Sequence, residues 1–291
     1  MAVTDQIRNP IEWGWDQLRD LQHALGATGH ALGGATGTSA EKLPSVRRID
    51  VDDLRDALQR GITDFGASRT DVIFLCLVYP VAGLFLSHLV FGYDFLPMLF
   101  PLASGFALLG PLAAVGLYEM SRRREQGHQV SWADALGVVK SPAAGAIFVL
   151  GLYLLALFIA WIIVAYGIYY MTLGPEPPSS VSGFVSDVFT TPAGWAMIVV
   201  GIGVGFLFAA AALTLSVVSF PLLLDRDVGL YPAIATSIRA VAANPYPMAV
   251  WGIVVAGGLV LGTIPLFIGL AVVMPVLGHA TWHLYRKLVP R

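Results

Sequence analysis

Two histidines near the C-terminal end of the chain have a spacing that suits metal binding. His279 and His283 are four residues apart in an apolar stretch, so on a helix they would share one face. Helical zinc sites use such pairs, but they need a third ligand at the same depth. Glu119 is the weak candidate for that ligand. The alternative, which we expect, is that Glu119, His279 and His283 only form hydrogen bonds at helix ends and that the chain holds no metal and no cofactor.

Glu119 is singled out by a layout that occurs twice. A proline is followed seven residues later by an aromatic residue and then by two cations, first as Pro111, Tyr118 and Arg122–Arg123 and again as Pro275, Trp282 and Arg286–Lys287. Aligning the prolines places Glu119 opposite His283, where the carboxylate could accept a hydrogen bond from the imidazole. The layout predicts a repeated unit, a hairpin of two apolar helices that leaves the membrane at cations. Because each unit starts and ends on the same side, the repeats are expected to be parallel.

Other chemistries find less support. The polar residues within the predicted spans are hydroxyls rather than acids or bases, which disfavours ion-coupled transport: Ser87, Ser104, Thr214 and Ser216. His88 and His279 differ in predicted depth by about 10–15 Å, at 1.5 Å per residue, which disfavours a bis-histidine haem. Gly-x-Ser-x-Gly, His-Glu-x-x-His and P-loop motifs are absent. We therefore expect no enzymatic activity, and the basic loops suit lipid head groups better than nucleic acid.

The composition is that of a polytopic membrane protein. Of the 291 residues, 56% are hydrophobic and 12% are charged, against about 25% charged in soluble domains, and the mean hydropathy is +0.73. Several apolar runs are as long as the roughly 20 residues that span a hydrocarbon core. Cys76 is the only cysteine, so no intrachain disulfide is possible. The N-terminus lacks the basic-then-apolar pattern of a signal peptide, so we expect no cleavage.

The chain divides into an N-terminal arm, residues 1–45, and an integral membrane domain, residues 46–291. The arm combines an amphipathic helix with a flexible linker rich in Gly, Ala, Ser and Thr. Trp13, Trp15 and Leu18 are its candidate contacts with a partner protein, because large aromatic residues anchor interfaces. The alternative is a helix that lies on the bilayer surface.

The membrane domain is expected to be an all-α bundle of six transmembrane helices, arranged as three parallel hairpin repeats with cytoplasmic amphipathic helices. The predicted spans are residues 72–91, 95–118, 144–171 and 193–220, and two shorter spans within 248–285 that separate at Gly262–Pro265. The predicted amphipathic helices are residues 50–68, 131–141 and 234–243. Residues 174–192, rich in proline and serine, are expected to form a loop.

Local signals add detail to these elements. Asp50-x-x-Asp53 resembles a helix start with acids in the first turn. The helix that follows carries an apolar stripe: Leu54, Leu58, Ile62 and Phe65. The second span contains prolines that are expected to bend it: Pro97, Pro101 and Pro111. The fourth span carries small residues suited to close helix packing: Gly201, Gly205 and Ala209.

The cations are confined to one set of connections between the spans. All 17 Lys and Arg fall before the first span, in the connections after the second and fourth spans, or in the C-terminal tail, and none falls in the three opposite loops. Loops rich in Lys and Arg stay in the cytoplasm. Both termini are therefore expected to be cytoplasmic.

Four stretches carry a resemblance to a known family. The run Pro275–Arg286, PVLGHATWHLYR, looks like a closing motif, and three other stretches fit the same pattern: Val46–Ile49, Gly110–Glu119 and Ser219–Arg226. Over roughly residues 46–286 the chain resembles DUF2189, a family of bacterial integral membrane proteins of unknown function. The resemblance implies six spans in the bacterial inner membrane. It implies no activity and no catalytic residue.

The sequence favours a non-enzymatic scaffold or accessory subunit that binds another membrane protein or lipid. The second possibility is a transporter or channel for an uncharged or apolar solute, and the third is a metal-binding membrane enzyme. A scaffold should copurify with a partner, a transporter needs a continuous polar-lined cavity, and the enzyme needs bound metal. The lipid bilayer is the partner that the composition implies directly.

Overall fold

A computed structural model describes residues 43–76, 93–265 and 268–291 of the chain. This part of the chain is helical and contains no strand. Residues 1–42, which include Trp13, Trp15 and Leu18 of the N-terminal arm, lie outside the described residues, as does most of the first predicted span. The partner contacts proposed for the arm therefore stay predictions.

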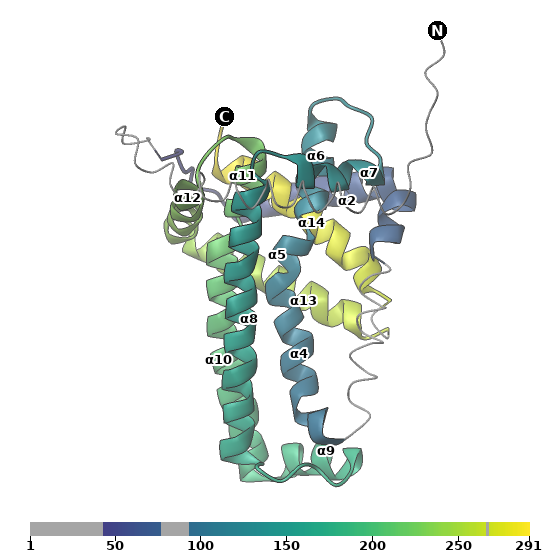
Figure 1. Cartoon of the computed structure of the whole chain (residues 1–291), viewed down its shortest axis with the longest axis vertical. Helices are drawn as coiled ribbons and strands as arrows, with labels where there is room; N and C mark the ends of the chain where they lie inside the picture. The colour runs from purple at the N-terminus through teal and green to yellow at the C-terminus, as the bar shows by residue number, and fades with distance from the viewer. Residues whose placement is uncertain (1–42, 77–92, 266–267) are drawn as a thin grey trace, which may run out of the picture.

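Four helical stretches of the described chain are long and apolar enough to cross a membrane: Leu96–Glu125, Ala144–Thr172, Pro192–Asp225 and Pro245–Thr263. Three of them run along the length of the molecule in Figure 1 and form a bundle. They correspond to the second, third and fourth predicted spans, and Pro245–Thr263 corresponds to the fifth. The count of six spans and the repeat stay predictions.

Proline interrupts the first of these stretches. It consists of η2 (Tyr93–Met98), α4 (Leu99–Phe106), η3 (Ala107–Leu109), α5 (Gly110–Ala113) and α6 (Val115–Glu125). Pro111 has no N–H, and in an α-helix its ring would clash with the carbonyl group of Ala107. The 3₁₀ stretch η3 begins at that residue, and a short tightened segment of this kind relieves the clash. The expected effect of proline is thus seen next to Pro111.

The other two long stretches are continuous apolar helices joined at the far end of the molecule. They are α8 (Ala144–Thr172) and α10 (Pro192–Ser216), the latter followed by α11 (Ser219–Asp225). The loop predicted between them is wrong in part, because it contains α9 (Val181–Thr190). The hydroxyl groups of Ser180 and Thr191 accept hydrogen bonds from backbone N–H groups at the starts of α9 and α10, which explains where these helices begin.

α2 (Val51–Cys76) begins as the sequence predicts. The side chain of Asp50 accepts a hydrogen bond from the backbone N–H of Asp53 at 2.9 Å, and the Asp53 carboxylate reaches back to the Asp50 N–H at 3.4 Å. α2 is one helix where the sequence predicts an amphipathic helix followed by a separate span. Ile62, assigned to its apolar stripe, is 53% exposed, whereas Ala57 is fully buried. The buried face is therefore rotated toward the smaller residues.

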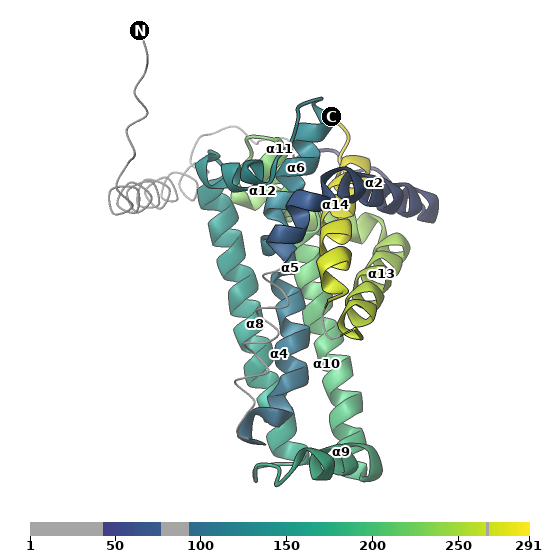
Figure 2. The same ribbon diagram turned by 90° about the vertical axis from the view of Figure 1, so that its right-hand side faces the viewer.

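α14 (Leu270–Leu288) lies between α2 and α6 (Figure 2). A Cβ atom built on Gly61 of α2 would lie 2.6 Å from the backbone nitrogen of Ala280, and one built on Gly278 of α14 would lie 2.6 Å from Leu117 of α6. The approach at Gly61 therefore requires the absence of a side chain, because the neighbouring atoms are backbone, whereas at Gly278 the nearest atom is Cδ1 of the Leu117 side chain. α2 runs antiparallel to α14, and α6 runs parallel to it, so the two helices that share the proline-to-cation layout point in the same direction.

The last two apolar helices form a short hairpin. α13 (Pro245–Thr263) ends at the predicted break, Gly262–Pro265, and α14 returns beside it. A Cβ atom on Gly269 would lie 2.9 Å from the Cα atom of Gly262, so the two helices cross closely at the turn. The hairpin stops well short of α9 in Figure 1, as expected from the shortness of these two helices.

The end of the bundle opposite α9 is a charged platform, which we call the basic end. It is built from α2, the last turns of α6 and α14, and three shorter elements: α7 (Trp132–Ala135), η4 (Leu136–Lys140) and α12 (Leu230–Ala243) (Figure 1). Asn244 ties the chain before α2 to this platform, because its side chain accepts a hydrogen bond from Ile49 N–H at 2.8 Å and donates to the Arg47 carbonyl at 3.1 Å. No Lys or Arg occurs in α8, α9 or α10.

Candidate functional site

The polar network at the basic end is centred on Asp64 of α2, which is 7% exposed. One carboxylate oxygen accepts hydrogen bonds from the Ser121 hydroxyl at 2.7 Å and from Nε2 of His283 at 2.8 Å. The other oxygen lies 3.2 Å from Nε of Arg124. Burial alone would raise the pKa of Asp64, but the hydrogen bonds from His283 and Ser121 outweigh burial and hold the pKa below its ordinary value. Asp64 is therefore a buried anion that joins α2, α6 and α14.

His279 extends this network by one hydrogen bond. Its Nδ1 atom lies 2.8 Å from Ser121 Oγ. Because the single hydroxyl proton of Ser121 is donated to the ionised Asp64, Nδ1 of His279 must be the donor in this contact. The Nε2 atom of His279 is then a buried lone pair, and it has no hydrogen-bond partner among the described residues. The hydrogen bonds therefore run from His279 to Ser121 and from Ser121 to Asp64, and His283 donates separately to Asp64.

This order differs from that of a hydrolase triad. In a hydrolase triad the histidine lies between serine and carboxylate and takes the serine proton. Here the serine lies between the histidine and the carboxylate, its proton points to Asp64, and its side chain is 1% exposed. Within residues 43–76, 93–265 and 268–291, no group of three or more His, Cys, Asp or Glu is placed to hold a metal ion.

Glu119 does not join the two histidines. Its carboxylate is 3% exposed and accepts hydrogen bonds from Nε of Arg122 at 2.7 Å and Nε of Arg123 at 2.7 Å, both on its own helix. The predicted bond between Glu119 and His283 is therefore wrong. The repeat layout did not give the direction in which the Glu119 side chain points. Ser121 faces α14, and two residues along an α-helix correspond to a rotation of about 200°, so Glu119 points away from it.

The shared face of His279 and His283 is confirmed, since both reach the same network. The central residue, Asp64, was missed. Its signal is its position seven residues after Ala57, which places a carboxylate on the small-residue face of an amphipathic helix. An acid within the buried arc of a helix requires partners from neighbouring elements, and His283, Ser121 and Arg124 are those partners.

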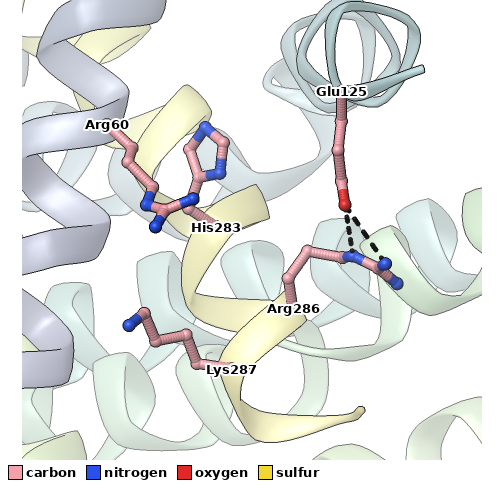
Figure 3. A pocket seen from close by; sticks show the side chains of 5 residues that line it. All are labelled: Arg60, Glu125, His283, Arg286 and Lys287. Atoms are coloured by element: carbon pink, nitrogen blue, oxygen red, sulfur yellow. Dashed lines mark hydrogen bonds and ion pairs between the residues drawn. The ribbon is translucent and has the colours of Figure 1, made fainter. Parts of the chain in front are cut away.

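A pocket of about 220 Å³ adjoins this network. It is lined by side chains from three helices, Arg60 of α2, Glu125 of α6, and His283, Arg286 and Lys287 of α14 (Figure 3). His283 thus belongs to both the network and the pocket.

The charged groups of the pocket are anchored by acids around it. Lys287 pairs with Asp53 at 3.0 Å and Asp56 at 2.8 Å. Arg286 pairs with Asp225 at 3.0 Å and Glu125 at 3.2 Å. Glu125 also accepts a hydrogen bond from the Trp282 indole at 3.1 Å, and Asp225 accepts one from the Tyr285 hydroxyl at 2.7 Å. The last turn of α14 is thereby fixed on every side by charge-assisted bonds.

Comparison with known proteins supports the resemblance predicted from the sequence. Residues 99–225 match the model of DUF2189, described as a predicted integral membrane protein. The match confirms the resemblance over α4 to α11, which is less than half of the chain. The stretches Val46–Ile49 and Pro275–Arg286 lie outside it. No curated protein and no solved structure matches the chain.

Proposed function

We propose that this integral membrane protein, similar to DUF2189 over residues 99–225, is a non-enzymatic scaffold that binds another membrane protein through the outer surface of its spans. The observation that carries the proposal is the exposure of the span Pro192–Asp225. Only 6% of its most apolar 18-residue window is buried within the chain. A helix with so little internal packing offers most of its surface to the membrane or to a neighbouring helix.

The glycines of α10 favour a protein neighbour over lipid alone. A Cβ atom built on Gly201 or Gly203 would meet no atom within 4 Å, whereas one on Gly205 would lie 3.2 Å from Trp161. Of the predicted small-residue stripe, Gly205 thus contacts α8, and Gly201 has no side-chain neighbour within 4 Å among the described residues. Glycine inside a helix costs about 1 kcal/mol relative to alanine, and close approach of a second helix is the usual compensation in membranes.

The hydroxyl groups within the spans disfavour the transporter alternative. Ser104 donates to the Phe100 carbonyl at 2.8 Å, Thr214 to Ala210 at 2.7 Å and Ser216 to Ala212 at 2.6 Å. Each bond returns to the residue's own helix, so the hydroxyl protons of these three groups are already used, and Ser87, the fourth hydroxyl, lies outside the described residues. The third alternative, a metal-binding enzyme, is disfavoured by the pairing of Glu119 with two arginines.

A tagged full chain isolated from its native membranes in mild detergent should retain a partner membrane protein that mass spectrometry identifies. Gly201→Leu should reduce the recovered partner at least severalfold, because the added side chain occupies the space that a second helix would use. Val199→Leu is the matched control, since it enlarges a side chain on the exposed surface of the same helix at a position where a bulky residue already prevents close approach. Equal recovery from the wild type and both variants, or no partner from the wild type, would contradict the proposal.

The proposed arrangement in the membrane has six spans in three parallel repeats, with both termini in the cytoplasm of a bacterial cell. Support comes from α6 and α14, which run in the same direction and end in cations at the basic end. The N-terminal arm, with Trp13, Trp15 and Leu18, would then lie on the cytoplasmic side as a second contact for the partner.

Cysteines placed at the two ends of the bundle should report this orientation. In a Cys76→Ser background, Ser186→Cys on the exposed face of α9 should react with an impermeant maleimide applied to intact spheroplasts, and Ser131→Cys at the basic end should not. Both positions are exposed, so the difference reflects the side of the membrane. Labelling of position 131 before lysis would refute the orientation.

A further inference from the structure

We propose that the pocket at the basic end binds the phosphate group of an anionic lipid head group. The inference goes beyond the scaffold proposal and does not depend on it. It rests on the position of the pocket, the charge of its lining and the hydrogen-bond donors that remain free there.

The pocket lies at the depth of lipid head groups. Glu125, which lines it, is the last residue of the apolar stretch Leu96–Glu125, and Arg286 and Lys287 belong to the last turn of α14. The apolar part of this stretch ends at Met120, before the charged residues Arg122–Glu125, so side chains at this level lie beyond the hydrocarbon core, among phosphate groups rather than acyl chains. Basic pockets between helices at such an end are suited to acidic head groups.

The lining of the pocket carries three cations, one carboxylate and one histidine. Glu125 would repel an anion, but its charge is offset by Arg286, by Arg291 at 3.2 Å and by the indole N–H of Trp282. Asp53, Asp56 and Asp225 pair with these cations, and Asp64 pairs with His283, but none of the four acids belongs to the pocket lining. The groups that line the space therefore favour an anion.

The cations keep hydrogen-bond donors for that anion. Arg60 uses Nε for its pair with Asp56 at 3.0 Å, and its two terminal nitrogens form no bond with the described residues. Lys287 shares its three hydrogens with two carboxylates, so one remains. Because their acidic partners already hold these side chains in place, binding a phosphate group costs little further side-chain entropy. The planar fork of Arg60 matches two phosphate oxygens.

The size of the pocket and its place in the membrane favour a lipid over a free anion. A volume of about 220 Å³ exceeds the roughly 30 Å³ that one water occupies in the liquid, so a tetrahedral phosphate fits with water around it. A lipid phosphate is confined to the membrane surface, where its effective concentration is far higher than that of dissolved phosphate. The phosphate group that the pocket recognises could thus come from a lipid or from dissolved phosphate, and experiment can separate the two.

Native mass spectrometry of the full chain in mild detergent, titrated with phosphatidylglycerol, tests the proposal. Arg60→Gln should weaken binding about fivefold, the effect expected for one cation near a membrane surface. Arg55→Gln is the matched control, because Arg55 is an exposed arginine of the same helix that pairs with Asp52 and does not line the pocket. Parallel titrations use phosphatidylcholine and inorganic phosphate.

Three results together would support the lipid site. Arg60→Gln, but not Arg55→Gln, should lose affinity for phosphatidylglycerol. Phosphatidylcholine should bind more weakly than phosphatidylglycerol, and millimolar inorganic phosphate should not displace phosphatidylglycerol. Equal loss in both variants would assign binding to general surface charge and overturn the proposal. Equal affinity for the two lipids, or displacement by inorganic phosphate, would overturn it as well. Arg60→Gln leaves the span surfaces untouched, so it should still copurify with a protein partner, and failure of one proposal leaves the other standing.

Discussion

Replacing Asp64 with alanine should lower the free energy of unfolding by about 3 kcal/mol. The substitution removes the acceptor for Ser121 and His283 and the ion-pair partner of Arg124, and it leaves these donors without a partner at the junction of α2, α6 and α14. The measurement is denaturant-induced unfolding of the detergent-solubilised chain, followed by tryptophan fluorescence. Trp251 and Trp282 are buried, and they report loss of the packed state.

Asp52→Ala is the matched control for this substitution. Asp52 lies on the same helix with a side chain that is 86% exposed, so the same chemical change should alter stability by less than about 0.5 kcal/mol. A double-mutant cycle sharpens the test. Asp64→Ala and His283→Ala should be coupled by about 0.5–3 kcal/mol, whereas Glu119→Gln and His283→Ala should be additive within about 0.5 kcal/mol. Additivity for Asp64 and His283 would mean that the network does not hold α2 in place.

Gly61→Ala should lower the free energy of unfolding by about 2 kcal/mol, although alanine is the better helix former. The new methyl group would lie 2.6 Å from the Ala280 nitrogen and 2.7 Å from the Val276 carbonyl oxygen. These are backbone atoms that cannot rotate away, so α2 must move off α14 and strain the bond between Asp64 and His283. The same unfolding assay measures the effect.

Gly66→Ala provides a comparison of opposite sign. Gly66 lies on α2 five residues further along, and a Cβ atom there meets nothing within 4 Å. The substitution should therefore raise stability by about 0.5–1 kcal/mol, through helix propensity alone. If the two alanines changed stability in the same direction, the close packing of α2 on α14 would be refuted.

The parts of the fold that follow from local sequence could be predicted. α8 was predicted as residues 144–171 and is observed as Ala144–Thr172. The agreement is close because an unbroken apolar run in a membrane can satisfy its backbone hydrogen bonds only by forming a helix. The break between α13 and α14 falls at Gly262–Pro265, where glycine and proline leave few alternatives. α9 was missed, although Ser180 is an N-cap residue that sequence reading can find.

The candidate site depended on the direction in which each side chain points about its helix axis and on contacts between residues far apart in the sequence. Local sequence patterns give neither. His279 and His283 were placed on one face because helical periodicity fixes that relation. Glu119 was assigned to them from its depth alone, and its rotation about α6 turned it toward Arg122 and Arg123 instead. The position of Asp64 on the small-residue face of α2 could be read from the sequence, but its partners on α6 and α14 could not, because local patterns do not show that Gly61 lets α2 approach α14.

The bond between Asp64 and His283 also sets the order in which the protein can assemble. The two residues are 219 positions apart, and ribosomes add about 5–20 residues per second, so the carboxylate waits roughly 10–40 s for its partner to be synthesised. Through that interval α2 lacks the helix against which it packs, and its buried face stays available to chaperones, lipids or proteases. The platform at the basic end is therefore completed last, and a chain released before position 283 would leave Asp64 with Ser121 and Arg124 but without His283.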